Sequence, residues 1–276
     1  MKISQRLQCI ADIITHSSLK EAVPRELSDS TVEHRAEPYQ HIWDCCCDHG
    51  HLGMLLLTEK TAAQVHFVDI IPSIMLNLQQ RLIKHFPICD AQTRCAWQLH
   101  TIDVLDLPLE TIDKQQTHLI VIAGVGGEQT LHMVQELSHK YSGFKLEFLL
   151  CPVRHQYKLR LGLKPFGLTV LNEKLVQENK RYYEIIHLAN AQCNASDVRE
   201  IVTDTAINSM SSISTTPLIP CGSLLWQPFD KQAKNYLQQT IEHCEKLLRG
   251  HNQQSAQYQR HLVMLADYQA VHKLTK

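Results

Sequence analysis

The sequence lacks several features that define large classes of proteins. Its 276 residues contain no run of about 18 apolar residues, so no membrane-spanning helix is expected. The first residues form no apolar core with a small-residue cleavage site, so no signal peptide is expected either. The formal net charge is only −1, which by itself indicates nothing about a polyanionic partner. With 44% apolar and 20% charged residues, the composition is that of a soluble globular protein.

Ten cysteines are present without one C-x-x-C pair. Cys45, Cys46 and Cys47 are contiguous, and neighbours in a strand point to opposite faces, so we expect no tetrahedral metal site. A disulfide framework is not expected in a chain of this length without a secretory signal. We therefore interpret the cysteines as reduced, mostly buried thiols of a cytoplasmic protein, and expect neither a metal nor a membrane partner.

Strand-like and helix-like segments alternate through the first two thirds of the chain. A helix over 3–15, with Ser4 as its N-cap, is expected first. Strands are expected near 41–46, 64–69, 97–102, 118–123, 145–151, 169–177 and 181–188, with helices near 51–58, 72–86, 128–140 and 153–165. This alternation predicts an α/β, Rossmann-like fold with a mostly parallel seven-stranded sheet whose last strand is antiparallel, the closing pair forming an edge.

Composition predicts three parts along the chain. Residues 1–190 are expected to form the α/β domain, with a polar insertion at 16–40. Residues 191–228 are rich in Asn, Ser, Thr and Pro, and we expect an irregular linker there. Residues 229–276 are expected to form a C-terminal helical or coiled-coil appendage, because the apolar residues Leu237, Ile241, Cys244 and Leu248 follow 4-3-4 spacing.

Four features that can bind a ligand lie at the expected carboxyl ends of strands. The turn from Asp44 to Gly53 carries two carboxylates and leads into a helix N-terminus. Asp69 ends the next strand, where a carboxylate can accept hydrogen bonds from both ribose hydroxyls. Asp103 is placed to meet an adenine amino group. In the segment 123–127, glycines let backbone and ligand approach closely because no Cβ intervenes.

The first turn lacks the G-x-G-x-x-G pattern of dinucleotide sites. Its acidic residues would repel a pyrophosphate but accept a cationic sulfonium. The pattern therefore predicts an S-adenosylmethionine site of a class I methyltransferase. The predicted cofactor-binding residues are Asp44, Cys46, Asp48, His49, Gly50, Leu52, Asp69, Ile70, Asp103, Val104, Ala123, Gly124, Val125, Gly126 and Gly127.

Several motifs carry a resemblance to one family. They are Ser4-Gln5-Arg6-Leu7, Asp44-Cys-Cys-Cys-Asp48-His49-Gly-His-Leu52, Ala123-Gly-Val-Gly-Gly127, Cys151-Pro-Val-Arg154 and Glu178-Asn-Lys-Arg-Tyr-Tyr183-Glu-Ile185. The second and third resemble D-x-G-x-D-H-x-x-L and A-G-M-G-G, and the last two resemble a Q-P-N turn and E-x-x-K-x-Y-E-I. With the helical tail, they are similar to the bacterial tRNA methyltransferases that modify N1 of adenine 22. The likeness covers about residues 3–15, 41–190 and 222–250.

The resemblance implies methyl transfer from S-adenosylmethionine to N1 of an adenine in tRNA. It places Asp48 and His49 beside the reacting centre, and Arg6 and Arg154 where they would steer phosphate or base. The chain departs from the family at two places. Cys46 replaces a glycine and would crowd the methionine part of the cofactor, and Cys-Pro-Val-Arg replaces Q-P-N on the base-facing side.

Other interpretations of these residues stay open. Asp44 and Asp48 suit helix caps. The strip 151–181 carries excess positive charge and either binds RNA or is a solvated surface; its charged residues are Arg154, Lys158, Arg160, Lys164, Lys174, Lys180 and Arg181 against Glu173 and Glu178. The apolar stripe of the tail suits internal packing or a dimer contact, so both a monomer and a homodimer are open.

Two other functions also stay open. One is a methyltransferase of the same fold that acts on another RNA or on a small molecule. The other is a non-catalytic RNA- or protein-binding module on a decayed methyltransferase scaffold, which the residue at position 46 motivates.

Overall fold

The computed structural model describes residues 3–19, 39–87, 96–193 and 216–275. In chain order the elements are α1 (Gln5–Leu19), β1 (Tyr39–Cys45), α2 (His51–Glu59), β2 (Ala62–Val68), α3 (Pro72–His85), β3 (Trp97–His100), the 3₁₀ turns η1 (Val104–Asp106) and η2 (Leu109–Thr111), β4 (Thr117–Ala123), α4 (Gly127–Lys140), β5 (Lys145–Cys151), α5 (Gln156–Leu163), η3 (Lys164–Phe166), β6 (Thr169–Glu178), β7 (Arg181–Ala189), β8 (Thr216–Pro217), α6 (Lys231–Arg249) and α7 (Ala256–Leu274). α1 runs past its predicted end at residue 15, and Ser4 caps it by accepting the Leu7 N–H at 3.2 Å.

The strands form one sheet in the order β3-β2-β1-β4-β5-β7-β6-β8. Strands β1 to β5 are parallel, and β7 pairs antiparallel with both β5 and β6. The predicted α/β fold is confirmed. The antiparallel last strand of the prediction is β7, and the β6–β7 pair closes this end of the sheet together with β8. Within the pair, β7 lies on the inner side, next to β5, and its residues 184–189 are all buried, as an inner strand requires.

A further short strand, β8, pairs antiparallel with β6, so the sheet has eight strands among the described residues and not seven. It lies in the segment for which we expected only irregular structure. Two residues give too little pattern for a prediction from sequence. Most of the expected insertion at 16–40 lies outside the described residues.

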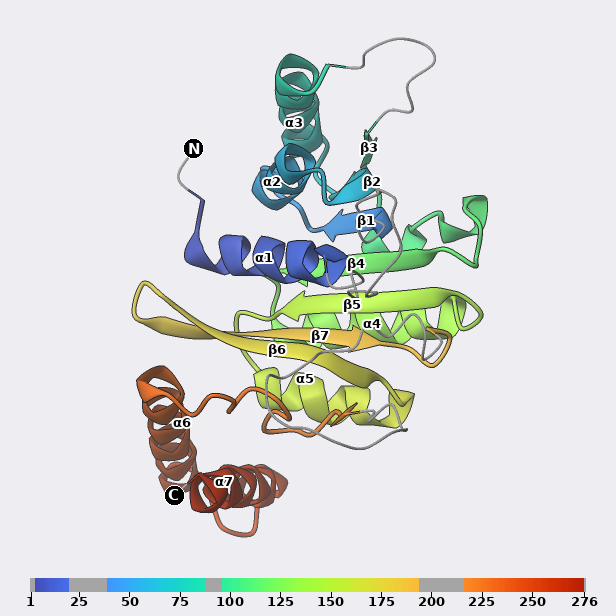
Figure 1. The fold of residues 1–276 in the computed structure, drawn as a ribbon. Coiled ribbons are helices and arrows are strands. Elements are labelled where there is room, and N and C mark those ends of the chain that lie inside the picture. The colour runs from blue at the N-terminus through green and yellow to red at the C-terminus, as the bar shows by residue number, and fades with distance from the viewer. Residues whose placement is uncertain (1–2, 20–38, 88–95, 194–215, 276) are drawn as a thin grey trace, which may run out of the picture.

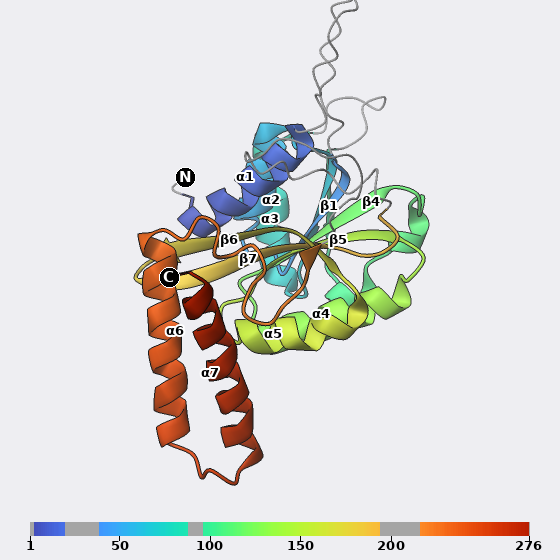
Figure 2. The ribbon, with the colours of Figure 1, turned by 60° about the horizontal axis from the view of Figure 1, so that its bottom comes forward.

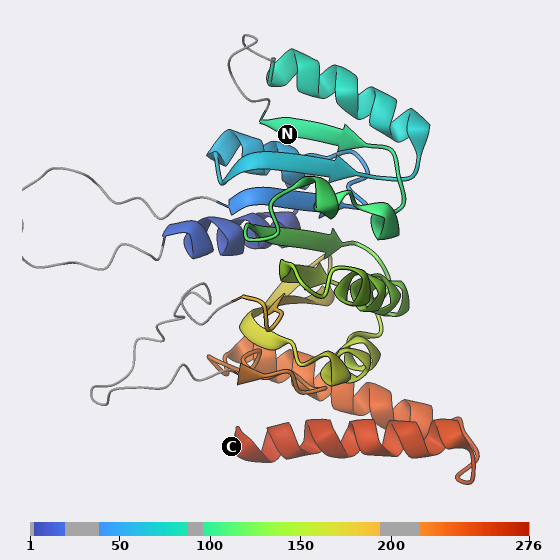
Figure 3. The same ribbon diagram turned by 90° about the vertical axis from the view of Figure 1, so that its right-hand side faces the viewer.

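Helices cover both faces of the sheet (Figures 1 and 3). Helices α1, α2 and α3 pack on one face, where Ile10, Leu56 and Leu78 meet Ile42 and other strand residues. Helices α4 and α5 pack on the other face, in the cluster that contains Cys45. Cys45 belongs to this second cluster and Cys46 packs against it, whereas Cys47 belongs to the first. The expectation that neighbouring cysteines point to opposite faces is therefore wrong for Cys45 and Cys46, because β1 ends at Cys45 and Cys46 has a positive φ.

A row of imidazoles lies along β1, β2 and β3 and lines a cavity of about 280 Å³. His41 Nδ1 is 2.9 Å from His66 Nε2, and His66 Nδ1 is 3.0 Å from His100 Nε2. Trp43 stacks on His66 with ring centroids 3.8 Å apart. Burial lowers the pKa of His100. One neutral tautomer of each ring satisfies these contacts, so the row is a buried hydrogen-bonded core feature.

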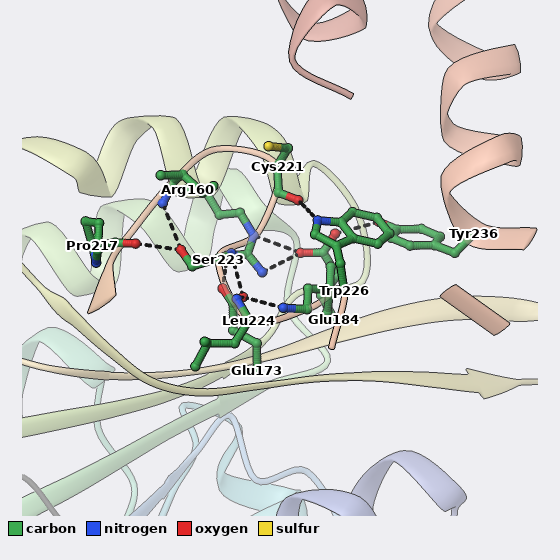
Figure 4. A network of polar contacts seen from close by, with 11 residues as sticks. Arg160, Glu173, Glu184, Pro217, Cys221, Ser223, Leu224, Trp226 and Tyr236 are labelled. Atoms are coloured by element: carbon green, nitrogen blue, oxygen red, sulfur yellow. Dashed lines mark hydrogen bonds and ion pairs between the residues drawn. The ribbon is translucent and has the colours of Figure 1, made fainter. Parts of the chain in front are cut away.

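A buried ionic network joins the C-terminal helices to the sheet (Figure 4). Arg160 Nε donates to Glu184 at 2.8 Å, and Arg160 Nη1 donates to Glu173. Glu173 Oε2 also accepts the backbone N–H groups of residues 223, 224 and 225 at 2.8, 2.6 and 2.9 Å. Tyr236 of α6 donates to Glu184 at 2.6 Å. One guanidinium, two carboxylates and four further hydrogen-bond donors therefore hold the tail against the domain.

This network removes one cation and one carboxylate from the expected basic strip over 151–181, so the excess positive charge of the strip is unchanged. Arg160 and Glu173 are buried and pair with each other, so neither contributes to the surface. Lys158 pairs with Glu128 at 2.6 Å. The exposed cations of the strip are Arg154, Lys158, Lys164, Lys174, Lys180 and Arg181.

Helices α6 and α7 form an antiparallel hairpin that projects from the domain (Figure 2). Leu237, Ile241 and Cys244 of α6 pack against Leu265 and Tyr268 of α7 in a cluster of their own. The apolar stripe of α6 is thus internal packing, one of the two uses the sequence left open.

The described cysteines form no disulfide bonds. The eight described cysteines are free thiols, six of them buried; Cys89 and Cys95 lie outside the described residues. Within the part of the chain that the structure describes, no group of side chains is arranged to hold a metal ion. In the same residues, no helix has the length and apolarity needed to cross a membrane.

Candidate functional site

The turn from β1 to α2 is held by one buried carboxylate. Cys46, Asp48 and Gly50 all adopt positive φ, at 55°, 49° and 66°. A Cβ on Gly50 would lie 2.6 Å from a methyl carbon of Leu78, and together with the positive φ this close contact favours glycine. Asp44 is 4% exposed and accepts the Gly53 N–H at 2.9 Å. Burial raises the pKa of Asp44 to about 7. Asp44 therefore ties the first turn of α2 to β1, as the capping interpretation predicts.

Two further carboxylates face the same turn. Asp69 accepts the Asp48 N–H through Oδ2 and the Ile71 N–H through Oδ1, both at 3.1 Å. Each oxygen keeps a second lone pair for a ligand. Asp103 is exposed and accepts the Leu105 N–H at 2.9 Å. Burial, together with the negative charges of Asp69, Asp44 and Asp103, raises the pKa of the thiol at position 46 to about 11, so all three carboxylates lie near that thiol.

The glycine loop between β4 and α4 packs against the loop after β5. Gly124 has a φ of 90° and is exposed. The Gly127 N–H donates to the Arg154 carbonyl at 2.9 Å, and the Val153 N–H donates to the Val125 carbonyl at 3.0 Å. A Cβ on Gly127 would lie 2.7 Å from two backbone carbonyl oxygens, which explains the glycine. Because residues 152–155 make these contacts, α5 begins only at residue 156 and not at 153 as predicted.

The predicted cations lie on the other side of the site. The Arg6 guanidinium carbon is 4.9 Å from the centre of the Tyr183 ring. Its Nη2 lies 4.0 Å from the position that a Cβ on Gly124 would take. Arg154 lies over Gly126, where a Cβ would be 3.3 Å from its Nε. The structure thus brings both arginines to the glycine loop.

The remaining predicted residues fall into two groups. The side chains of Asp48 and His49 are 67% and 62% exposed and lie 3.7 Å apart, and Ile70 is 64% exposed. Ala123 and Val125 are half-buried at the loop. By contrast, Leu52 and Val104 are buried in the two core clusters and support the loops from below. The residue at position 46 is half-buried and packs against the cluster that contains Cys45.

Sequence reasoning missed Tyr183 and the link between α1 and the β6–β7 hairpin. The Gln5 N–H at the start of α1 donates to Glu178 Oε1 at 2.9 Å, so the hairpin fixes the position of Arg6. Glu178 and Tyr183 both belong to the motif at 178–185. The motif is the sequence signal for this link, although its spacing alone does not indicate a contact with the start of α1.

The fold and this edge of the sheet define a class of protein. Parallel strands ending in acidic turns, a glycine loop after β4 and an antiparallel β7 inserted beside β6 describe a class I, Rossmann-like methyltransferase domain. The sequence agrees: the family model described as "Methyltransferase domain" matches residues 30–186, and the chain belongs to that family. A search of curated proteins gives no match.

Solved structures show the same fold over the whole chain. TrmK of M. capricolum, in complex with S-adenosyl-homocysteine, is 15% identical over 100% of both chains, with a TM-score of 0.64. TrmK of B. subtilis, an m1A22 tRNA methyltransferase, is 17% identical over 100% of this chain and 99% of that one, with a TM-score of 0.58. A Streptococcus agalactiae protein of the NADB-Rossmann superfamily is 13% identical over 98% and 97%, with a TM-score of 0.63. At these identities the likeness concerns the fold, including the C-terminal helices.

Proposed function

We propose that the chain is an S-adenosylmethionine-dependent tRNA methyltransferase that modifies N1 of an adenine. The observation that carries the proposal is the charge division of the site. Three carboxylates surround the turn after β1, and two arginines without a carboxylate partner among the described residues lie across the glycine loop. A site of this kind suits a cationic cofactor on one side and a phosphate-bearing substrate on the other.

The residues present fit S-adenosylmethionine. Asp69 has lone pairs for the two ribose hydroxyls, and Asp103 is exposed where it can accept from the adenine amino group. The bare backbone of Gly124 admits close approach of a ligand. The thiol at position 46, which the sequence suggested would crowd the cofactor, packs at least partly into the core.

The cofactor would supply an electrophilic methyl group, and the chain's residues would position the acceptor. N1 of adenine already carries a lone pair, so the transfer needs alignment and exclusion of water more than a strong base. N1 lies on the Watson–Crick edge, so a paired adenine must leave its stack first. Asp48 and His49 would border the reacting atoms, and Arg6 and Arg154 would steer phosphate or base.

The exposed cations and the fixed tail support RNA as the substrate class. Six exposed Lys and Arg side chains lie between residues 154 and 181. The tail that they neighbour is held by the buried network of Arg160, Glu173 and Glu184, so it offers a surface of fixed orientation. Phosphate contacts of this kind give affinity by charge and shape. The name of the B. subtilis structure, an m1A22 tRNA methyltransferase, supports this substrate class.

A methylation assay tests the proposal. Unmodified tRNA from a strain lacking the enzyme is incubated with labelled S-adenosylmethionine, and the product is located by nuclease digestion and mass spectrometry. We expect one N1-methyladenosine per acceptor tRNA and none with free adenosine. The loop 151–154 departs from the family at the base-facing side, which favours another RNA target as the second candidate. Label at another base would support that candidate, and no label in any RNA would contradict both.

A further inference from the structure

The Arg6 guanidinium makes no ion pair with a carboxylate of the residues that the structure describes. Its Nε is buried without a hydrogen-bond partner, and the described residues offer its guanidinium no ion pair. Arg160 shows the alternative, since two carboxylates bind that buried guanidinium. A buried donor of a charged group is costly when it has no partner. The charge of Arg160 is thus paired within the protein, whereas that of Arg6 makes no ion pair with the described residues.

Arg6 is nevertheless held in place. The Tyr183 ring lies 4.9 Å from its guanidinium carbon, which is cation–π distance. The start of α1 is fixed by the Gln5 N–H to Glu178 bond of 2.9 Å and by the Ser4 cap. The free end of the guanidinium reaches the exposed Gly124, at the carboxyl edge of the sheet. In Figure 1, the start of α1 and the β6–β7 turn lie on the side toward which the β5 arrow points.

Building on the proposed function, we propose that Arg6 and Tyr183 form an oxyanion clamp at the glycine loop. Arg6 binds the anion, and Tyr183 is the positioning residue that holds the guanidinium. A guanidinium over an aromatic ring keeps N–H donors in its own plane, which matches the two oxygens of a carboxylate or phosphate. Two ligands of the proposed reaction carry such a group: the amino-acid tail of the cofactor and the phosphate of the target nucleotide.

The test compares four variants of the full chain, Arg6→Gln, Arg6→Lys, Tyr183→Leu and Tyr183→Phe, with three ligands. S-adenosylhomocysteine carries the carboxylate, 5′-methylthioadenosine is the same nucleoside without it, and tRNA carries the phosphates. Calorimetry measures the first two affinities and filter binding measures the third. Lys114→Gln, an exposed cation just before β4, is the matched control.

We expect Arg6→Gln to weaken binding of either S-adenosylhomocysteine or tRNA at least tenfold, with methylthioadenosine within twofold of wild type. The ligand affected identifies the source of the oxyanion. Arg6→Lys keeps the charge without the planar fork and should lose less. Tyr183→Leu should weaken the same ligand at least threefold, and Tyr183→Phe, which keeps the ring, should match wild type.

Two results would overturn the clamp. If Arg6→Gln binds all three ligands like wild type, Arg6 holds no oxyanion. If Tyr183→Leu keeps full affinity while Arg6→Gln does not, Tyr183 does not position it. Failure of the proposed function looks different, because wild type would then bind neither nucleoside. The tRNA measurement alone would then decide the clamp.

Discussion

The two halves of the site treat charge in opposite ways. In the cofactor half, Asp44, Asp69 and Asp103 each accept at least one backbone N–H, at 2.9–3.1 Å. In the acceptor half, Arg6 is held by an aromatic ring and Arg154 lies over a glycine, and neither makes an ion pair with a carboxylate of the described residues. The carboxylates are thus oriented by the turns they cap, whereas the arginines keep their donors for a ligand. Ligands of opposite charge are the natural complement of such a site.

The largest effect is expected in the cofactor half, from Asp69→Ala. This change removes the ribose acceptor and frees the N–H groups of Asp48 and Ile71. We expect at least a hundredfold loss of S-adenosylhomocysteine affinity by calorimetry, about 3 kcal/mol. Asp113→Ala is the matched control, because Asp113 accepts the Gln115 N–H at 2.9 Å in a similar turn before β4. Equal losses in both variants would break the assignment.

In the acceptor half, Arg154→Gln is expected to change the binding of tRNA and not the binding of the cofactor. We expect the KM for tRNA to rise about tenfold at low salt, with S-adenosylhomocysteine affinity unchanged, because a phosphate contact is lost. The slope of log affinity against log salt should fall by about 1. Lys114→Gln serves as the control. A loss of cofactor affinity in Arg154→Gln would show that the two halves are not separate.

The buried carboxylate of the cofactor half has a measurable pH dependence. The pKa of Asp44 is raised from 3.8 to about 7 by burial, so the folded protein binds this proton more tightly than the unfolded chain. The contribution of Asp44 to stability is therefore full below about pH 4 and lost as the pH rises to about 7. Asp44→Asn keeps an acceptor for Gly53 without the charge. Denaturant unfolding at pH 5 and pH 8 should show the variant gaining about 1–4 kcal/mol relative to wild type at the higher pH. An equal difference at both values would contradict the burial argument.

The smallest effect is expected at the glycine position of the first turn. Cys46 has a φ of 55°, where a side chain costs about 1–2 kcal/mol and glycine costs nothing. Glycine loses more entropy on folding, so Cys46→Gly should stabilise by about 0.5–1 kcal/mol in denaturant unfolding. Cofactor affinity should stay within threefold, because the thiol packs against the core. Cys46→Ala keeps the strain and is the control. A tenfold gain of affinity in both variants would show that the thiol does crowd the ligand.

Much of the fold was predictable because it depends on local pattern. Apolar runs between turn residues placed β1 to β7 within a few residues, and Ser4 was recognised as a cap from its position alone. The acidic turns could also be placed, because parallel strands end at the same edge of the sheet. These features need no knowledge of distant contacts.

The rest depends on partners that are remote in sequence. Arg160 reads as one cation of a basic strip, and only the folded chain brings Glu173 and Glu184 to it. Likewise, the ring of Tyr183 contacts Arg6, although the two residues lie far apart in the sequence. The inserted position of β7 follows from burial on both faces, which the sequence suggests but does not order relative to β5 and β6. Charge counts along the sequence therefore do not show which charged side chains are buried in pairs.

The central claim is that the acidic half of the site binds S-adenosylmethionine. It is tested most directly by titrating the wild-type protein with S-adenosylhomocysteine in a calorimeter. We expect one site per chain with micromolar affinity. No heat of binding up to millimolar ligand, with and without tRNA, would contradict it and would leave a non-catalytic scaffold as the function of this fold.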